Sequence, residues 1–253
     1  MTLAYTILAA VLGAVLGSFF NVVIYRLPRG ESLVKPASHC PQCDAAIKPY
    51  DNIPVLSWML LRGRCRNCGE QISIRYPVVE AMTAALFAAV VLDKGADRDA
   101  WLGLAFVAAL IPIAMIDLEH RLIPNTITLP AAVAAPVILA LTHPDKLPEF
   151  LIAGTAAAGF LLVALLAYPR GMGMGDVKLA GVMGLYLGTA VAPAMLMAFL
   201  SGSVVGVAIM VREGAAARKK AVPFGVFLAL GGIAAVLVGS ELVDLYQTHF
   251  LGR

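Results

Sequence analysis

The chain has 253 residues, of which 60% are hydrophobic and only 14% are charged. Soluble chains average about 25% charged residues, and a soluble domain of this length could not bury so much apolar surface. The composition therefore excludes an ordinary soluble protein and indicates one embedded in a lipid bilayer. The net charge of +3 is less informative than the positions of the charges, which cluster between apolar stretches. We expect the bilayer, and no nucleic acid, among the partners.

Eight apolar segments are expected to form transmembrane helices, because a span needs roughly 20 predominantly apolar residues. In chain order they are residues 3–25, 77–92, 100–116, 126–141, 150–167, 178–187, 190–211 and 222–243. The sixth is short and contains glycine, which is typical of a tilted or half-buried helix. The predicted fold class is an all-α polytopic membrane protein with about eight transmembrane helices and a small polar loop domain.

The distribution of basic residues predicts the orientation of these helices, since cytoplasmic loops are enriched in Lys and Arg. With eight spans, one set of loops contains 15 of the 19 basic residues. That set is expected to face the cytoplasm, which places both termini on the opposite, outer side of the membrane. Residues 3–25 follow no positively charged region, so an uncleaved anchor is expected and not a signal peptide.

The predicted domains are a first transmembrane helix at 1–25, a cytoplasmic domain at 26–76 and a membrane domain at 77–253. All four cysteines lie in the cytoplasmic domain, where thiols are kept reduced. They form two Cys-x-x-Cys pairs separated by 21 residues: Cys40 with Cys43, and Cys65 with Cys68. Two such pairs can close a tetrahedral S4 site that suits Zn(II), with no open position for catalysis. Iron in a rubredoxin-like site and free thiols are the alternatives.

Two carboxylates are candidate catalytic groups, because an ionisable residue beside a membrane span is costly. Asp117 directly follows an apolar run, and Asp176 lies in a glycine-rich stretch immediately before a predicted span. The predicted topology puts both at the same membrane face. Two neighbouring aspartates cannot both ionise easily, so one keeps a proton while the other activates water. That arrangement is suited to acid–base hydrolysis of a peptide bond.

The glycines around Asp176 favour such a site. Gly171, Gly173 and Gly175 are expected to allow positive φ and the close approach of a substrate strand. The alternative is structural. Asp176 would then be the N-cap of the sixth helix, and Asp117 would pair with Arg121 one helical turn away.

Several motifs together resemble the bacterial type IV prepilin peptidases, which are GxGD aspartyl proteases. The two principal ones are Asp117-Leu118-Glu119 followed by Ile123-Pro124, and Gly173-Met174-Gly175-Asp176-Val177-Lys178-Leu179. Further matching segments, in family order, are residues 17–28, the cysteine pairs, and residues 53–58, 75–80 and 223–225. The resemblance extends from the first span to the last.

This resemblance implies an intramembrane aspartic endopeptidase with Asp117 and Asp176 as the catalytic pair. Members of the family remove short basic leaders from prepilins and type II secretion pseudopilins, cutting after a glycine at the cytoplasmic face. The form that contains the cysteine domain also resembles the bifunctional enzymes, which N-methylate the new amino terminus with S-adenosylmethionine.

The methyl-donor site is not marked by a glycine-rich Rossmann fingerprint. The candidate cofactor-binding residues lie near the cytoplasmic ends of the first two spans: Asn21, Arg26, Arg75 and Glu80. Asn21 could instead make an interhelical hydrogen bond, and Glu80 could complement a helix dipole.

Two glycine pairs are expected to be packing faces between helices, because small residues four positions apart allow close approach. They are Gly13 with Gly17 and Gly202 with Gly206.

Two other functions remain open at this stage. One is a leader peptidase without methyltransferase activity, whose metal domain only docks the substrate. The other is a transporter or channel with intramembrane aspartates. Transporters usually show paired halves, whereas here the two aspartate motifs differ and no halves match.

Overall fold

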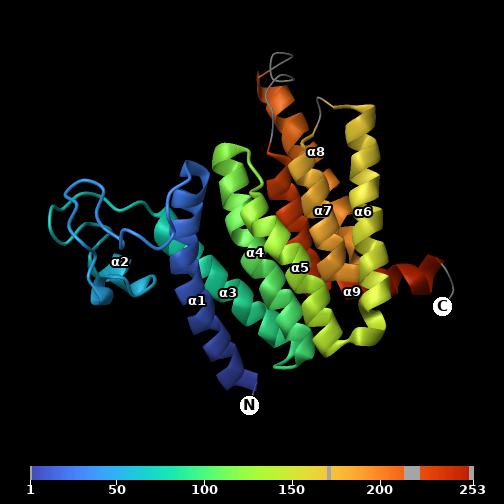
Figure 1. The fold of residues 1–253 in the computed structure, drawn as a ribbon, viewed down its shortest axis with the longest axis horizontal. Helices are drawn as coiled ribbons and strands as arrows, with labels where there is room; N and C mark the ends of the chain where they lie inside the picture. Colours follow the sequence, from blue (N-terminus) through green and yellow to red (C-terminus); the bar gives the residue numbers. More distant parts are fainter. Residues whose placement is uncertain (1, 170–171, 214–222, 251–253) are drawn as a thin grey trace. The chain divides into compact units, whose positions relative to one another are not determined.

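The computed structural model describes residues 2–169, 172–213 and 223–250 (Figure 1). Within these ranges the chain is almost entirely helical, and its only β-pairing consists of two isolated bridges. The long helices are α1 (Thr2–Arg26), α3 (Arg75–Lys94), α4 (Arg98–His120), α5 (Asn125–Thr142), α6 (Leu147–Ala167), α7 (Met174–Leu187), α8 (Val191–Glu213) and α9 (Phe224–Phe250). The short elements are α2 (Leu56–Leu60) and the 3₁₀ turns η1 (Leu27–Arg29), η2 (Pro49–Asp51), η3 (Pro144–Lys146) and η4 (Gly188–Ala190).

The all-α polytopic class is confirmed, because each of the eight predicted segments coincides with a helix. The count of eight spans is not confirmed. In the part of the chain described, six helical runs are long and apolar enough to cross a membrane: Thr2–Arg29, Arg75–Lys94, Arg98–His120, Asn125–Thr142, Pro144–Ala167 and Met174–Glu213. The last run contains α7, η4 and α8. At 14 residues, α7 covers about 21 Å, less than a hydrocarbon core of about 30 Å.

The apolar part of α9, Phe224–Gly239, is shorter than the other candidate spans. The segment predicted for this region starts at residue 222, which lies outside the described residues. The chain forms two compact units, Met1–Ala96 and Asp97–Arg253, which are described separately below.

In the first unit, α1 packs against α3 over its glycines. A Cβ added at Gly13 would lie 2.7 Å from the carbonyl oxygen of Thr83, and one at Gly17 would lie 2.7 Å from the Cα of Glu80. The backbones therefore approach closely only because these positions lack side chains. The predicted packing role of Gly13 and Gly17 is confirmed, and it places α3 beside α1 in the same unit as the cysteine loop.

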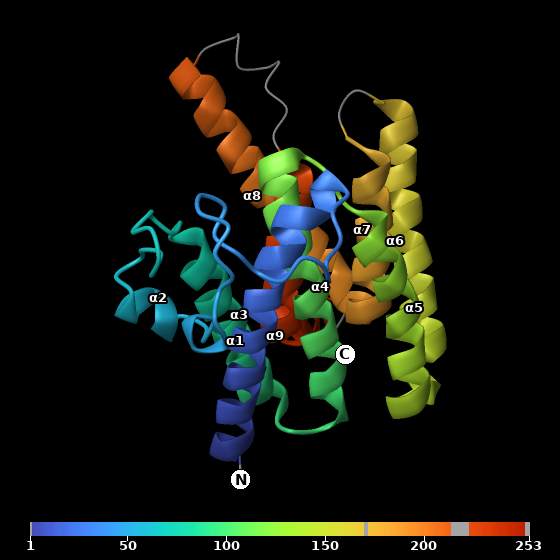
Figure 2. The same ribbon diagram turned by 60° about the vertical axis from the view of Figure 1, so that its left-hand side comes forward.

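The second unit is a bundle of α4 to α9 whose chain runs up and down between its two ends (Figures 1 and 2). Its core contains fully buried apolar side chains from α4, α7 and α9, among them Leu110, Met183 and Leu228. Phe106 of α4 stacks on Tyr186 of α7 with ring centroids 4.8 Å apart. This packing brings the end of α4 and the starts of α7 and α9 to one end of the unit.

Candidate active site and metal centre

Asp117 lies in the last turn of α4, and its side chain is hydrogen-bonded to the start of α9. Its side chain is only 5% exposed. The backbone N–H of Val226 donates a hydrogen bond to its Oδ2 over 3.1 Å, across 109 positions of sequence. Because the first N–H groups of a helix have no intrahelical acceptor, α9 satisfies a free donor with this carboxylate and fixes its position.

Asp176 lies in the first turn of α7 and is also buried, at 8% exposure. The N–H of Gly173 donates to its Oδ2 over 2.9 Å, and the N–H of Asp176 donates to the Gly173 carbonyl over 3.1 Å. Gly173 is thus the N-cap and Asp176 the third residue of the helix. The structural alternative, in which Asp176 is itself the N-cap, is therefore wrong, although its carboxylate does stabilise the start of α7.

Ile123, in the connection between α4 and α5, lies between the two aspartate-bearing helix ends. A Cβ added at Gly225 would lie 2.8 Å from both Asp117 Oδ2 and Ile123 Cδ1, and one at Gly175 would lie 3.0 Å from Ile123 Cβ. The negative charge of Asp176 acts on the carboxylate of Asp117. Two buried carboxylates thus lie at the same end of the second unit, where α4, α7 and α9 meet.

The polar contacts around the two aspartates do not match the structural alternative, in which Asp117 pairs with Arg121. Asp117 forms no ion pair with Arg121 within the described ranges. Instead Arg121 has φ of +54° and ends α4 by donating its N–H to the Asp117 carbonyl over 2.8 Å. Lys178 of α7 donates to the side-chain oxygen of Asn125 over 3.0 Å, which ties the start of α7 to the start of α5.

The expected use of the glycines needs a correction. Gly173 has φ of −102°, and neither it nor Gly175 is among the residues with positive φ. Gly171 lies outside the described residues. What Gly175 provides is close packing, because any side chain there would press on Ile123.

Sequence reasoning did not place two contributors at this site: Gly225, which was noted only as part of a matching segment, and the amide of Val226. The available signal was the Pro223-Phe224-Gly225 segment at a helix start, since proline is common before or within the first helical turn. Nothing local to that segment indicates that its free amides meet a carboxylate from α4.

The four cysteines of the first unit form the predicted cluster. Their sulfur atoms all lie within 4.8 Å of one another, and Cys40 Sγ is 3.8 Å from Cys68 Sγ. A tetrahedral zinc site with Zn–S bonds of about 2.3 Å has sulfur–sulfur edges of about 3.8 Å, so the donor set fits this ion. His39 contacts the Ala37 carbonyl at 3.0 Å and is not part of the cluster.

Each Cys-x-x-Cys pair forms a knuckle with the same backbone geometry. The first cysteine donates its N–H to the carbonyl five residues later and accepts from the N–H four residues later. The bonds are Cys40 to Ala45 (3.0 Å), Asp44 to Cys40 (2.9 Å), Cys65 to Glu70 (2.8 Å) and Gly69 to Cys65 (3.0 Å). Asp44 and Gly69 follow the second cysteines and have φ of +53° and +74°. The fold therefore presents two preformed pairs of thiols.

The thiols within the cluster differ in acidity. The side-chain amide of Asn67 donates to Cys43 Sγ over 3.4 Å and lowers the pKa of Cys43 to about 7. A backbone hydrogen bond at Glu70 lowers the pKa of Cys68. Burial and the neighbouring thiols outweigh it and raise this pKa to about 12. Four sulfurs this close cannot all ionise unless a cation compensates their charge.

Two contacts hold the loop around the cysteines. Arg66 donates to both carboxylate oxygens of Asp51, at 2.7 to 3.0 Å, and so joins the second knuckle to η2. The indole N–H of Trp58 donates to the Ile72 carbonyl over 3.0 Å.

The candidate cofactor-binding residues fall into two groups. Asn21 and Glu80 are buried and make structural contacts. Asn21 Nδ2 donates to the Tyr76 carbonyl over 3.1 Å, and Glu80 Oε2 accepts the N–H of Val55 at 2.7 Å. Arg75 starts α3, where its guanidinium lies 5.4 Å from the centre of the Tyr76 ring.

Arg26, by contrast, lines a cavity of about 370 Å³ in the first unit. The other walls are one face of α1, the segment 33–38, and Asn52 and Pro54. Its Nη1 donates to the Ser32 carbonyl over 3.0 Å, which holds the side chain in place. Sites for small molecules usually measure about 300–1,000 Å³, so this volume fits a cofactor.

These features define a class of protein: a polytopic helical membrane protein with a four-cysteine centre in one unit and two buried carboxylates at one end of the other. Comparison with known families gives two matches. The Bacterial Peptidase A24 N-terminal domain matches residues 11–94, and the Type IV leader peptidase family matches residues 104–211.

Curated relatives are similar over most of the chain, and each is named prepilin leader peptidase/N-methyltransferase. The protein of Bacillus subtilis (strain 168) is 36% identical over 96% of this chain and 98% of its own length. That of Pseudomonas putida is 35% identical over 93% of this chain and 91% of its own. That of Myxococcus xanthus (strain DK1622) is 38% identical over 85% of this chain and 66% of its own. No solved structure gives a significant match.

The chain therefore belongs to the type IV leader peptidase family. The resemblance noted from the sequence is confirmed, and the transporter alternative is excluded by this membership. The two matched regions also fall on either side of the division between the units at Ala96 and Asp97.

Proposed function

We propose that the chain removes the leader of prepilins and pseudopilins at the membrane, with Asp117 and Asp176 as the catalytic pair. Membership of the leader peptidase family makes it a membrane peptidase. The observation that supports these two residues is their burial at the meeting point of α4, α7 and α9, where the charge of Asp176 acts on the carboxylate of Asp117. Both carry a fixed hydrogen bond from a backbone amide, so their oxygens are held in place before substrate binds.

The chemistry of such a pair is general acid–base hydrolysis. The ionised carboxylate takes a proton from water while the water oxygen attacks the scissile carbonyl carbon. The protonated carboxyl group gives its proton to the carbonyl oxygen. When the tetrahedral intermediate collapses, the C–N bond breaks and the leaving nitrogen receives a proton from the pair. The proton is thus shared by the pair and not owned by one residue.

Mass spectrometry of a prepilin expressed with each variant tests this assignment. Asp117→Asn and Asp176→Asn should leave the leader attached, because neither amide can act as an acid or a base. Asp145→Asn is the matched control, since Asp145 is an exposed aspartate in η3. Leader removal by either of the first two variants would contradict the assignment.

Methyl transfer to the new amino terminus is proposed as the second activity, as the names of the relatives state for those proteins. S-Adenosylmethionine would supply the methyl group. The cavity beside Arg26 is proposed as its site, because it is large enough and has a fixed cation at its wall. Residues 26–76 and the adjoining helices would then form the methyltransferase region, and residues 77–253 the peptidase.

Equilibrium binding of S-adenosylmethionine to the purified chain tests the cavity. Arg26→Gln should weaken binding and methylation while leader removal continues, whereas Arg29→Gln, at an exposed neighbouring arginine, should leave both intact. If Arg26→Gln kept the full affinity for S-adenosylmethionine, the cofactor would have to bind at another site. If the unaltered chain produced a cleaved but unmethylated pilin, it would be a leader peptidase without methyltransferase activity.

Zn(II) is proposed for the cysteine cluster, on the fit of the sulfur distances to a tetrahedral site. Elemental analysis of the purified chain distinguishes zinc from iron. One zinc per chain is expected, with loss of the metal in Cys65→Ser; iron as the only metal would contradict the assignment.

The multiple apolar helices and the relatives place the chain in a bacterial inner membrane. We further propose that the cysteine loop and the aspartate pair face the cytoplasm and both termini the periplasm, on the distribution of basic residues. In spheroplasts, a membrane-impermeant thiol reagent should label Asp145→Cys from outside. Labelling of that position only after lysis would reverse the proposed orientation.

A further inference from the structure

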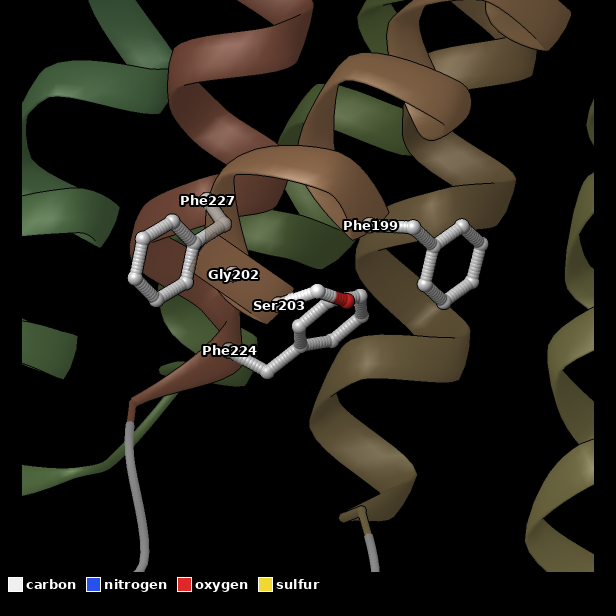
Figure 3. Close-up of a pocket in the computed structure, with 5 residues that line it drawn as sticks. All are labelled: Phe199, Gly202, Ser203, Phe224 and Phe227. Carbon is white, nitrogen blue, oxygen red and sulfur yellow. The ribbon is translucent and has the colours of Figure 1, made fainter. Parts of the chain in front are cut away.

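Two cavities of the protein differ in their lining. The one between α8 and α9 has a volume of about 190 Å³ and is mainly aromatic (Figure 3). Its walls are Phe199, Gly202, Ser203, Phe224 and Phe227. The larger cavity beside Arg26 includes polar groups and a stretch of irregular backbone, represented by Asn52 and Pro54. The backbone directly after Pro54 is strained.

Val55 follows Pro54 and has a conformation that a β-branched residue rarely adopts. Its φ is +62° and its ψ is −51°, and the N–H of Leu56 donates to the Pro54 carbonyl over 2.6 Å. Residues 54–56, the Val55 turn, thus form a γ-turn with positive φ, which is rare and strained. A positive φ is a genuine outlier for a β-branched residue. Such strain persists only where the surrounding structure holds it, and it is concentrated at functional sites.

Glu80 of α3 holds the Val55 turn. Its side chain is buried, and its Oε2 accepts the N–H of Val55 at 2.7 Å, across 25 positions of sequence. This N–H belongs to the peptide group that Pro54 and Val55 share, so the hydrogen bond fixes the orientation of Pro54 in the cavity wall. The buried hydroxyl of Ser57 accepts the N–H of Ile53 at 3.0 Å and holds the residue before the turn.

Glu80 also contacts the helix that forms another wall of the cavity. A Cβ added at Gly17 would lie 2.7 Å from the Cα of Glu80, so α1 packs directly on the backbone of this residue. Ser18, the next residue of α1, lines the cavity, as does Arg26 at the end of the helix. Glu80 therefore joins the helix that carries Arg26 to the turn that carries Pro54.

We propose that Glu80 is a positioning residue for the methyl donor. Its carboxylate holds the strained Val55 turn, and with it Pro54, in the place that S-adenosylmethionine requires. The proposal rests on the assignment of the cavity beside Arg26 to S-adenosylmethionine. Glu80 acts through the turn, since it is not among the described residues that line the cavity. Without the carboxylate, the turn should relax to negative φ and displace the wall.

Matched variants separate the hydrogen bond from the strain. Glu80→Ala removes the acceptor, whereas Glu80→Gln keeps a carbonyl oxygen that accepts the same bond. Val55→Gly relieves the strain, because glycine adopts positive φ about as readily as negative φ. Arg62→Gly is its control, since Arg62 has φ of +53° in the same loop but donates its N–H to the Met59 carbonyl.

Two measurements on the full chain in lipid nanodiscs test the proposal: equilibrium binding of S-adenosylmethionine, and hydrogen exchange of residues 53–57 without the cofactor. Glu80→Ala should weaken binding by about tenfold or more, as expected for loss of a hydrogen bond to a charged group, and should speed the exchange. Glu80→Gln should stay within about threefold of the unaltered chain. Glu31→Ala, at an exposed glutamate outside the lining, should change neither measurement.

The double variants give the sharper result. Adding Val55→Gly to Glu80→Ala should restore the affinity by about threefold or more, because the turn then persists without the carboxylate. Adding Arg62→Gly to Glu80→Ala should restore none of it. The metal content of each variant should equal that of the unaltered chain.

Three results would overturn the proposal: full affinity in Glu80→Ala, a loss that Val55→Gly does not reduce or that Arg62→Gly reduces equally, and a loss of affinity accompanied by loss of the metal. The last would show that Glu80 only stabilises the fold of the first unit. Arg26→Gln, measured alongside, separates the two assignments. Full affinity in that variant removes the cavity as the methyl-donor site, whereas weakened binding there together with any of the three results removes only the role of Glu80.

Discussion

The cysteine centre of the first unit and the carboxylate pair of the second are assembled in opposite ways. Cys40 and Cys68, the outermost ligands, are 28 positions apart, and each pair is shaped by hydrogen bonds within its own knuckle. Asp117 is held by an amide 109 positions away, at the start of another helix. The first site depends on local turns and a metal, and the second on how closely helices pack. Each should therefore fail independently and for a different reason.

Removal of the metal should have the largest effect. In isolated zinc-binding peptides the metal contributes about 10–16 kcal/mol of apparent folding free energy, and the loop around the knuckles has little core of its own. A chelator should make residues 38–72 susceptible to protease and fast in hydrogen exchange, while α4 to α9 keep their protection. Loss of protection in α4 or α7 on chelation would contradict the independence of the two sites.

Gly225→Ala should have the largest effect on the aspartate site short of removing a carboxylate. The new Cβ would meet Asp117 Oδ2 and Ile123 Cδ1, each at 2.8 Å, so one of them must move. A displacement of about 1 Å at a catalytic group costs about 100-fold in rate. We expect a loss of this order in kcat for leader removal, with zinc content unchanged. Gly206→Ala is the control, and comparable activity in both variants would show that the contact is easily relieved.

Gly69→Ala should weaken the metal site moderately, because Gly69 has φ of +74° directly after Cys68. A left-handed conformation costs a residue with a side chain about 1–2 kcal/mol, which corresponds to roughly a 5–30-fold loss of zinc affinity in a chelator competition. Gly30 has φ of +70° but lies outside the knuckles. Gly30→Ala should therefore carry the same strain without changing zinc affinity; equal losses in both variants would contradict the local account.

Arg66→Gln should produce the smallest effect. The Arg66 guanidinium donates to Asp51 and lowers the pKa of that carboxyl group. The ion pair therefore contributes stability above the pKa of the unfolded chain, and this contribution is lost as the pH falls through the lower pKa of the folded state. An NMR titration of the Asp51 carboxyl should show its midpoint rise in Arg66→Gln. Arg64→Gln should leave it unchanged, and a rise in both variants would point to net charge and not to the ion pair.

Much of the fold could be predicted from the sequence, because long apolar segments in a bilayer have few alternatives to helix. The cysteine cluster was equally predictable, since its spacing lies within one polar segment. The number of spans was not, because α7 has only 14 residues and only the short turn η4 separates it from α8.

The candidate site was predictable only in its two carboxylates. Gly175 was expected to supply backbone freedom, but its role is the close contact with Ile123, which depends on how α7 meets the connection after α4. The Val226 amide gives no signal in the sequence, because any helix start offers free N–H groups. Gly202 and Gly206 belong to the same small-residue pattern, yet among the described residues an added Cβ would meet another side chain within 4 Å only at Gly202. Such differences arise from tertiary packing, which a residue pattern does not specify.

The most direct test of the central claim is a double-mutant comparison of leader removal. Residues that act as one catalytic unit are strongly non-additive. Asp117→Asn and Asp176→Asn should each reduce kcat/KM by about 10³-fold or more, and the double variant should be no slower than either single one. Losses that multiply in the double variant, or near-normal activity in either single variant, would contradict the assignment of Asp117 and Asp176 as one catalytic pair.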